Sequence, residues 1–319
     1  MVRESTPRAA AAIHRFAARM TSYTPGRCHA GAVSSCHSRA WRHGEEVATD
    51  FPLADLDRWL AEPDALVWLD LLEPEPAVLA ALAEELRLDP LAVEDAVEPR
   101  ERPKATFHAH HIFLTCYSTR IEELPGDGVE FELGRVSAFV LRNALVTVRT
   151  DDRVDMAAVV ARWNEDGLLT HGVAALVHGM LDELVDGYFA TIESMDDLLE
   201  ELEDMLFDPA MKPRAIQQRV FGLRKALVQL RRVVLPMREV VTAVMRFRGE
   251  GDRSLSSELD GNFNDLYDHV IRAAEWTESL RDMVSSIFET QLSLQDARLN
   301  EVMKKLAGWG AIIAVPTAI

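Results

Sequence analysis

The chain has 319 residues and carries 52 acidic against 34 basic side chains, which gives a formal net charge of −18 at pH 7. A chain of this length can bury a large core and has room for more than one structural part. Its negative charge argues against a nucleic-acid partner, because the phosphate backbone repels an acidic protein.

The first 44 residues differ from the rest in charge, with one acid, Glu4, against seven arginines. They lack the continuous apolar core of a secretory signal peptide, and we predict that residues 1–44 form a mobile leader. The three cysteines, Cys28, Cys36 and Cys116, are an odd number, which suits a reducing cytosol and predicts no disulfide framework. A histidine follows each of the first two cysteines, but the regular ligand spacing of a structural zinc site is absent.

An α/β domain is predicted over residues 45–170. Runs of β-branched and apolar residues between turn residues indicate strands, and runs with a helical period indicate helices. The predicted strands are 66–72, 112–119, 132–141 and 144–150, and the predicted helices are 77–86, a second that starts after Asp89-Pro90, and 154–163. Asp89 can cap this second helix and Pro90 suits its first turn. Strands with helices on both sides in the sequence describe an αβα domain with a mixed sheet.

No motif for catalysis occurs along the chain: there is no Gly-rich phosphate loop, nucleophile elbow or zinc-protease helix, so the sequence does not support an enzyme. Three histidines, His108, His110 and His111, lie at the start of the second strand. Alternate residues of a strand share a face, so only His108 and His110 would converge. Since no cysteine or carboxylate adjoins them, we interpret all three as surface histidines at a strand edge rather than as metal ligands.

Residues 171–261 are predicted to form an antiparallel helical hairpin followed by a polar linker, 249–261. The first helix, 171–206, is rich in acids, and the helix after the Pro-containing turn at 208–213 is rich in arginine. Successive helices joined by a short turn pack antiparallel, and opposite charges favour that pairing. Exposed ion pairs contribute little, so buried leucines are expected to supply most of the stability.

Residues 262–319 are predicted to form one very long stalk helix, about 67 Å from Asn262 to Leu306 at roughly 1.5 Å per residue. Apolar and small residues recur in steps of four and three, which lays one stripe along the helix and requires a partner helix. The stripe consists of Leu266, Val270, Ala273, Thr277, Leu280, Val284, Ile287, Gln291 and Leu294.

The last fourteen residues, 306–319, carry no charge. A bilayer span needs about 20 apolar residues, so length alone favours a buried helix of a soluble domain. Lys304, Lys305 and Trp309 favour a different interpretation, because basic residues and an indole are typical of the cytoplasmic edge of a membrane helix.

Several spaced motifs occur in one order: Asp89-Pro-Leu-Ala-Val-Glu-Asp-Ala96, Leu181-Asp-Glu-Leu-Val-Asp-Gly-Tyr-Phe189, Asn264-Asp-Leu-Tyr-Asp-His269 and Asn300-Glu-Val-Met-Lys-Lys-Leu306. Together they resemble the cytoplasmic domain, stalk and first membrane helix of the CorA-type magnesium transporter family, over about residues 45–319. The resemblance implies a homopentamer in the plasma (inner) membrane, with most of this chain on the cytoplasmic side. The family's Gly-Met-Asn signature lies beyond the last residue, so we expect residues 306–319 to begin a truncated first transmembrane helix.

The resemblance also assigns metal ligands. Glu94 and Asp95 on the early helix, and Asp265 near the top of the stalk, match the family's acids that bind metal between subunits. Asp182 matches a further acid of that site. The alternative for each is an ordinary carboxylate on a helix surface. Mg²⁺ takes one or two carboxylates directly and keeps water as its other ligands, so a few acids from different elements suffice.

On the stalk, Asn300, Met303 and Ala307 share one helix face and match the family's pore-lining pattern. A polar amide can hold a hydrated ion, whereas methionine makes an apolar constriction. Lys304 and Lys305 are expected to form a basic ring at the membrane surface. The alternative for Asn300 is a place in an ordinary helix–helix contact.

The expected function is therefore transport of a divalent cation by a homo-oligomeric channel, gated by cytoplasmic metal bound between subunits. Mg²⁺ is the expected cargo and regulator, with Co²⁺ or other divalent cations also possible substrates. Two alternatives stay open: a truncated form that binds metal and regulates without transporting, and a transporter for Zn²⁺, Co²⁺ or Ni²⁺. The expected partners are further copies of the chain, divalent cations and membrane lipid at the C-terminal end.

Overall fold

The structure is a computed structural model that describes residues 35–99, 101–124, 128–165, 167–208, 211, 213–250 and 257–317. Contacts divide the chain into two compact units, and each is described by itself. The first consists of Met1–Arg120, Glu132–Thr191 and Leu230–Ala274, and the second of Ile121–Phe131, Ile192–Gln229 and Glu275–Ile319.

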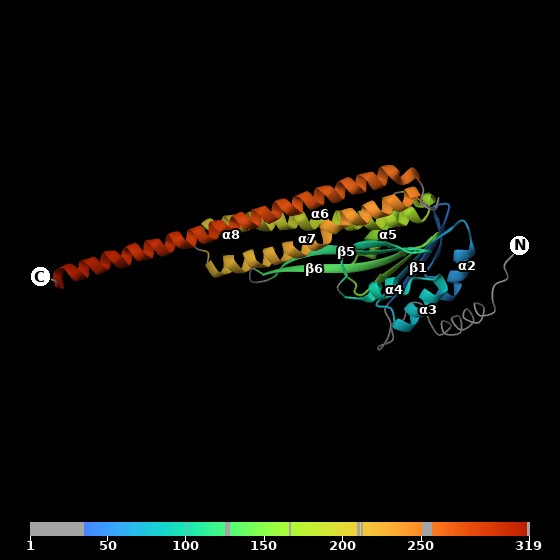
Figure 1. The fold of residues 1–319 in the computed structure, drawn as a ribbon, viewed down its shortest axis with the longest axis horizontal. Coiled ribbons are helices and arrows are strands. Elements are labelled where there is room, and N and C mark those ends of the chain that lie inside the picture. Colours follow the sequence, from blue (N-terminus) through green and yellow to red (C-terminus); the bar gives the residue numbers. More distant parts are fainter. Residues whose placement is uncertain are drawn as a thin grey trace. The chain divides into compact units, whose positions relative to one another are not determined.

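The first unit is built on a seven-stranded sheet with the strand order β2-β1-β3-β7-β6-β5-β4. Figure 1 labels its strands β1, β5 and β6. The strands are β1 Cys36–Arg42, β2 Glu45–Thr49, β3 Ala65–Leu72, β4 Lys104–Phe107, β5 Ile112–Leu124, β6 Gly128–Val140 and β7 Ala144–Arg149. Strands β3 and β7 run parallel, whereas β1 is antiparallel to both of its neighbours and β6 is antiparallel to β7. The predicted α/β class with a mixed sheet is confirmed.

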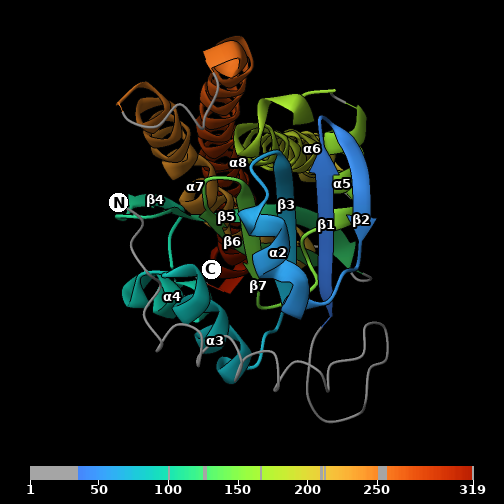
Figure 2. The ribbon, with the colours of Figure 1, turned by 90° about the vertical axis from the view of Figure 1, so that its right-hand side faces the viewer.

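Helices cover both faces of this sheet, because β3 is apolar on both of its sides. One face is covered by three short helices: α2 Leu56–Ala61, which follows a 3-10 turn at Leu53–Asp55, α3 Pro76–Leu86 and α4 Pro90–Val97. These helices share one hydrophobic core with Val67, Leu69 and Leu71 of β3. Figure 2 shows α2 in front of β3. On the opposite face, Trp68 packs edge-on against Trp163 of α5 Met156–Glu165, with 5.1 Å between the ring centroids.

The prediction that the folded body begins at residue 45 is wrong. Strand β1 lies inside the sheet between β2 and β3, and its Ala40 and Trp41 are fully buried. The arginines that suggested a solvated leader are paired: Arg39 donates to Glu46, and Arg42 Nε donates to Glu62 Oε2 at 3.0 Å. Residues 1–34 of the predicted leader, including Cys28, lie outside the described residues.

The remaining predicted strands and short helices are present, with ends shifted by a few residues. The Asp89 carboxylate accepts a hydrogen bond from the Leu91 backbone N–H at 2.9 Å, and Pro90 is the first residue of α4, as predicted. Strands β5 and β6 are longer than predicted, whereas β2, β4 and α2 were not predicted.

Three long helices complete the chain: α6 Val173–Phe207, α7 Pro213–Glu250 and α8 Asp260–Thr317, the last preceded by a 3-10 turn, Ser257–Leu259. In the second unit, Arg219 of α7 donates to Glu201 of α6 across the short connection, which makes the two helices antiparallel there. The buried side chains of this hairpin include Leu198, Leu202, Leu223 and Leu227.

Helix α8 buries the predicted apolar stripe over most of its length. Leu266, Val270 and Ala273 are fully buried in the first unit, and Val284 and Ile287 are buried in the second. Every residue from 296 to 309 is exposed. Within the described residues, no helix is both long enough and apolar enough to cross a membrane.

Candidate metal centre

The parts of α6 and α8 that belong to the first unit hold acids and histidines opposite each other. On α6, His178, Asp182 and Asp186 follow in steps of four residues and share one face, as do Asp265 and His269 on α8. Asp182 and Asp265 line one hollow of about 390 Å³, together with Leu168, His178, Gly261 and Asn262. One turn further along, ligand atoms of Asp182, Asp186 and His269 all lie within 4.8 Å of one another. The structure thus brings together two of the four predicted metal acids.

Arg162 of α5 reaches into this acid cluster. Its Nη1 donates to Asp182 Oδ2 at 2.6 Å, its Nε donates to Glu183 Oε2 at 3.0 Å, and its Nη2 donates to Asp186. Burial alone would lower the pKa of Arg162, but the hydrogen bond to Glu183 and the charges of Asp182 and Asp186 outweigh burial and raise this pKa. The guanidinium is therefore held charged and offsets part of the negative charge that would attract a metal ion.

Two imidazoles adjoin the same acids. His269 Nε2 lies 3.8 Å from Asp265 Oδ2, and its Nδ1 is buried without a hydrogen-bond partner among the described residues. His178 is 5 % exposed, and its Nδ1 likewise has no partner within the described part of the chain. Carboxylates alone suit Mg²⁺, whereas a mixed nitrogen and oxygen set also suits Zn²⁺, Co²⁺ and Ni²⁺.

Sequence reasoning missed Arg162, His178 and His269. The four-residue steps on α6 and α8 would have found the histidines as neighbours of the acids. No local signal could have placed Arg162, which comes from a different helix.

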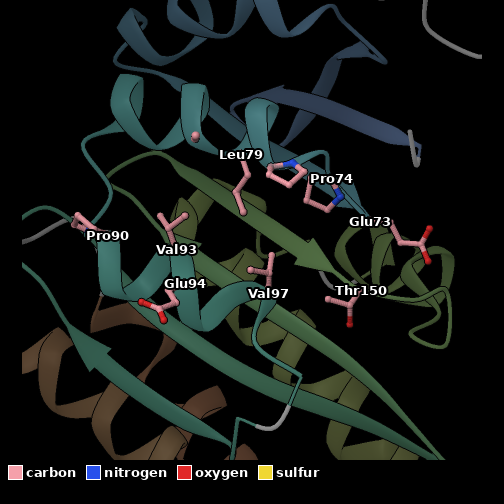
Figure 3. Close-up of a pocket in the computed structure, with 10 residues that line it drawn as sticks. Glu73, Pro74, Leu79, Pro90, Val93, Glu94, Val97 and Thr150 are labelled. Carbon is pink, nitrogen blue, oxygen red and sulfur yellow. The ribbon is translucent and has the colours of Figure 1, made fainter. Parts of the chain in front are cut away.

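Asp95 and Glu94 lie on α4, and neither is among the described residues that line the hollow of Asp182 and Asp265. Asp95 accepts a hydrogen bond from Lys104 Nζ at 2.6 Å, and Lys104 also donates to Glu101 at 2.7 Å. Burial would lower the pKa of Lys104, but the bonds to these two acids outweigh burial and raise it. Asp95 is thus paired with a lysine of its own chain, while Glu94 is exposed at a groove between α3 and α4 (Figure 3).

The histidine cluster lies between β4 and β5. The prediction of surface histidines holds for His110, which is exposed, but is wrong for His111, which is 5 % exposed. Its ring stacks on that of His108 at 4.7 Å, and His108 Nδ1 lies 3.4 Å from Asp89 Oδ2. Burial and the neighbouring His108 lower the pKa of His111 to about 4, so its imidazole is neutral at pH 7. Apolar packing against Phe139, with ring centroids 5.6 Å apart, replaced the expected solvent contact.

The predicted pore residues lie on the exposed end of α8. Asn300, Met303 and Ala307 are all exposed in the single chain, as are the adjacent Lys304 and Lys305. Lys305 Nζ lies 2.8 Å from Glu301 Oε1 one turn earlier. Leu299, Val302 and Leu306 are more than half exposed beside them.

Comparison with known proteins finds relatives in sequence and matches in fold. The cobalt/magnesium transport protein CorA of Thermotoga maritima is 28% identical over 233 residues, which are 72% of this chain and 64%, less than two thirds, of that protein. The complete structure of the CorA magnesium transporter from Methanocaldococcus jannaschii matches with a TM-score of 0.67 at 20% identity, covering 87% of this chain and 82% of that chain. The full-length CmaX protein matches with a TM-score of 0.69 at 18% identity, over 88% and 83% of the two chains.

At these identities the two structural matches establish the fold alone. The family model described as CorA-like Mg²⁺ transporter protein matches residues 63–319, which is most of the chain. The chain belongs to the CorA-like Mg²⁺ transporter family.

Proposed function

We propose that the chain is a subunit of a homo-oligomeric transporter of divalent cations, with Mg²⁺ as cargo and as cytoplasmic regulator. The observation that carries this proposal is the pairing of Asp182 on α6 with Asp265 on α8 around one hollow, in a chain of this family. Relatives are named as cobalt/magnesium transport proteins, which supports Co²⁺ as a second substrate.

The regulatory step follows from the exposure of the acids. The Asp265 side chain is 73 % exposed and that of Asp95 is 31 % exposed, so an ion from solution can reach both carboxylates. With Mg²⁺ between them, Asp95, Glu94, Asp182 and Asp265 bind copies into a closed ring. Without Mg²⁺, the carboxylates repel, and the ring opens. The ion shifts this balance only by its difference in affinity for the two states.

The conducting part of the proposal concerns the exposed end of α8. Five copies of the stalk bring Asn300, Met303 and Ala307 around one axis, where the amide holds a hydrated ion and the methionine narrows the path. Lys304 and Lys305 then lie at the cytoplasmic surface of the inner membrane, next to lipid. The bulk of the chain stays on the cytoplasmic side.

A second candidate function is transport of Zn²⁺, Co²⁺ or Ni²⁺ in place of Mg²⁺. Its support is His269, whose ring nitrogen lies within 4.8 Å of ligand atoms of Asp182 and Asp186. Nitrogen donors favour these ions over Mg²⁺. A metal-binding, regulatory form that does not transport has the same ligands, and only flux distinguishes it.

The test is the native mass of the full chain in mild detergent, measured by light scattering with millimolar Mg²⁺ and with EDTA. We expect a pentamer that is more compact with Mg²⁺, and loss of that response in Asp182→Asn with Asp265→Asn. Asp197→Asn, an exposed acid further along α6, is the matched control. A monomer in both conditions contradicts the proposed assembly. Competition of Mg²⁺ flux by Zn²⁺ and Co²⁺ in proteoliposomes then separates the candidate cargoes.

A further inference from the structure

An apolar groove lies between helices α3 and α4 on the first unit. It has a volume of about 540 Å³, which is within the usual range of ligand pockets. Its lining is mostly apolar: Pro74, Pro76, Leu79, Ala80, Pro90, Val93 and Val97. Figure 3 shows Leu79, Val93 and Val97 around one common space. Val97 is 42 % exposed, and it lies with other apolar side chains in a concave surface, which is the usual character of a ligand site.

The charged side chains of this groove are of one sign. Glu73 and Glu94 belong to its lining and are both exposed, and no Lys or Arg is among the described residues that line it. The groove therefore suits an occupant that is apolar on one side and basic on the other.

The chain itself reaches the sheet at the edge of this groove. The backbone carbonyl of Ser35 accepts a hydrogen bond from the Leu72 N–H at 3.1 Å. Leu72 directly precedes Glu73 and Pro74, which line the groove. The segment before Ser35 is thus attached beside the groove, and the fifteen residues from Thr21 to Ser35 can span up to about 50 Å when extended.

That segment has the required chemistry. Residues 8–20 read Arg-Ala-Ala-Ala-Ala-Ile-His-Arg-Phe-Ala-Ala-Arg-Met, with three arginines and no acid. Ile13, Phe16 and Met20 are its large apolar residues. Attachment to the same chain raises the local concentration of such a segment to the millimolar range expected for short linkers.

We propose that residues 8–20 bind in the groove between α3 and α4 of their own chain. The large apolar side chains fill the space around Leu79, Val93 and Val97, and the arginines face Glu73 and Glu94. Because Glu94 is also one of the acids in the proposed function, the bound segment competes with metal there. This competition rests on the proposed function, whereas the docking does not.

The test uses the full chain with the photo-cross-linking residue p-benzoylphenylalanine in place of Phe16, in EDTA so that metal plays no part. We expect cross-links to peptides covering 74–80 or 90–97, and Val97→Arg should lower their yield at least fivefold. The matched control is Leu91→Arg, because Leu91 is 69 % exposed on the same helix but does not line the groove. Thermal unfolding followed by circular dichroism verifies that both variants are folded.

Three outcomes would overturn the proposal. The first is an equal yield in Val97→Arg and the unsubstituted chain, and the second is cross-linking to other parts of the chain or to added phosphatidylglycerol vesicles. The third is cross-linking between different copies of the chain. In a mixture of ¹⁵N-labelled and unlabelled chains, docking within one chain joins only two labelled or two unlabelled peptides. Cross-links between a labelled and an unlabelled peptide, at the frequency of random mixing, would assign the groove to a second copy. Each of these results leaves the metal proposal unaffected.

Discussion

The first unit contains two arginine–carboxylate networks that differ in burial. In the sheet, Arg149 of β7 donates through Nη2 to Asp70 of β3 at 2.7 Å, and Thr147 donates to the same carboxylate at 2.6 Å. Asp70 is completely buried, and the Arg149 side chain is 4 % exposed. At the candidate metal centre, Arg162 is 24 % exposed and its partner Asp186 is 48 % exposed.

The same chemistry therefore has two different consequences. In the sheet, Arg149 cannot be removed alone, because Asp70 would stay buried without a counter-ion. Arg149 itself also pairs with Asp152 at 2.9 Å. At the metal centre, water and ions reach the carboxylates, so a metal ion can replace the Arg162 guanidinium as their counter-ion at a small cost in free energy. A buried network of this kind fixes a fold, while a half-exposed network can respond to an ion.

The strongest test of this contrast is Arg149→Met, which leaves the Asp70 carboxylate buried and unpaired. We expect a loss of about 3–5 kcal/mol in the free energy of unfolding, measured in urea. Replacing both residues, with Arg149→Met and Asp70→Leu, should recover most of that loss, since no isolated charge remains. A loss below about 1 kcal/mol in the single variant would show that the pair is less buried than its geometry implies.

A second test asks whether burial acts in the same way on a group without a counter-ion. Burial and, to a smaller extent, His108 lower the pKa of His111 to about 4. His110 lowers this pKa slightly further, whereas the negative charge of Asp89 raises it. The unfolded chain therefore binds more protons, and stability is complete above about pH 6.5 and falls as the pH drops toward 4. The pKa falls from 6.5 to about 4, so at about 1.4 kcal/mol per unit of pKa the total loss is roughly 3–4 kcal/mol.

This pH dependence is measured by urea unfolding at pH 7.5 and pH 5. His111→Leu should remove most of the difference between the two values, whereas His110→Leu should reduce it only slightly, because His110 makes the smallest contribution to the lowered pKa of His111. If both variants kept the dependence of the unsubstituted chain, another group would be its source.

The distance along the chain between interacting residues explains which features of the structure could be predicted from the sequence. The cap at Asp89 and the apolar stripe on α8 were predicted, because each depends on residues a few positions apart. Strand β1 was missed because its arginines find partners on β2 and after α2, which the sequence does not place beside it. Arg162 was missed for the same reason: its partners on α6 meet it only in the folded chain.

A third test concerns the internal cation at the metal centre. Arg162→Gln removes the charge that competes with a bound ion, so we expect the affinity for Mg²⁺ or Co²⁺ to rise about tenfold, which equals 1.4 kcal/mol. The cost in folding stability should stay near 1 kcal/mol, as for other partly exposed pairs. Titration calorimetry on the full chain measures the affinity.

Arg281→Gln is the matched control for this variant. Arg281 is an exposed arginine on α8 that pairs with Asp282 and Glu278 of the same helix. An equal or lower metal affinity in Arg162→Gln would mean that the arginine positions the acids instead of competing with the ion.

The smallest effect on stability is expected for Asp95→Asn combined with Asp265→Asn. Both acids are partly exposed, so neutralising them should change the free energy of unfolding by less than about 1 kcal/mol. Their removal should nevertheless abolish the protection from proteolysis that Mg²⁺ gives to the full chain, because the proposed bridge between copies loses an acid on each side. Asp197→Asn should retain that protection.

The single variants sharpen the contrast: Lys104 already offsets the charge of Asp95, so Asp265→Asn should weaken protection more than Asp95→Asn. Protection that persists in the double variant would place the metal response on Asp182 and Asp186, the acids held by Arg162.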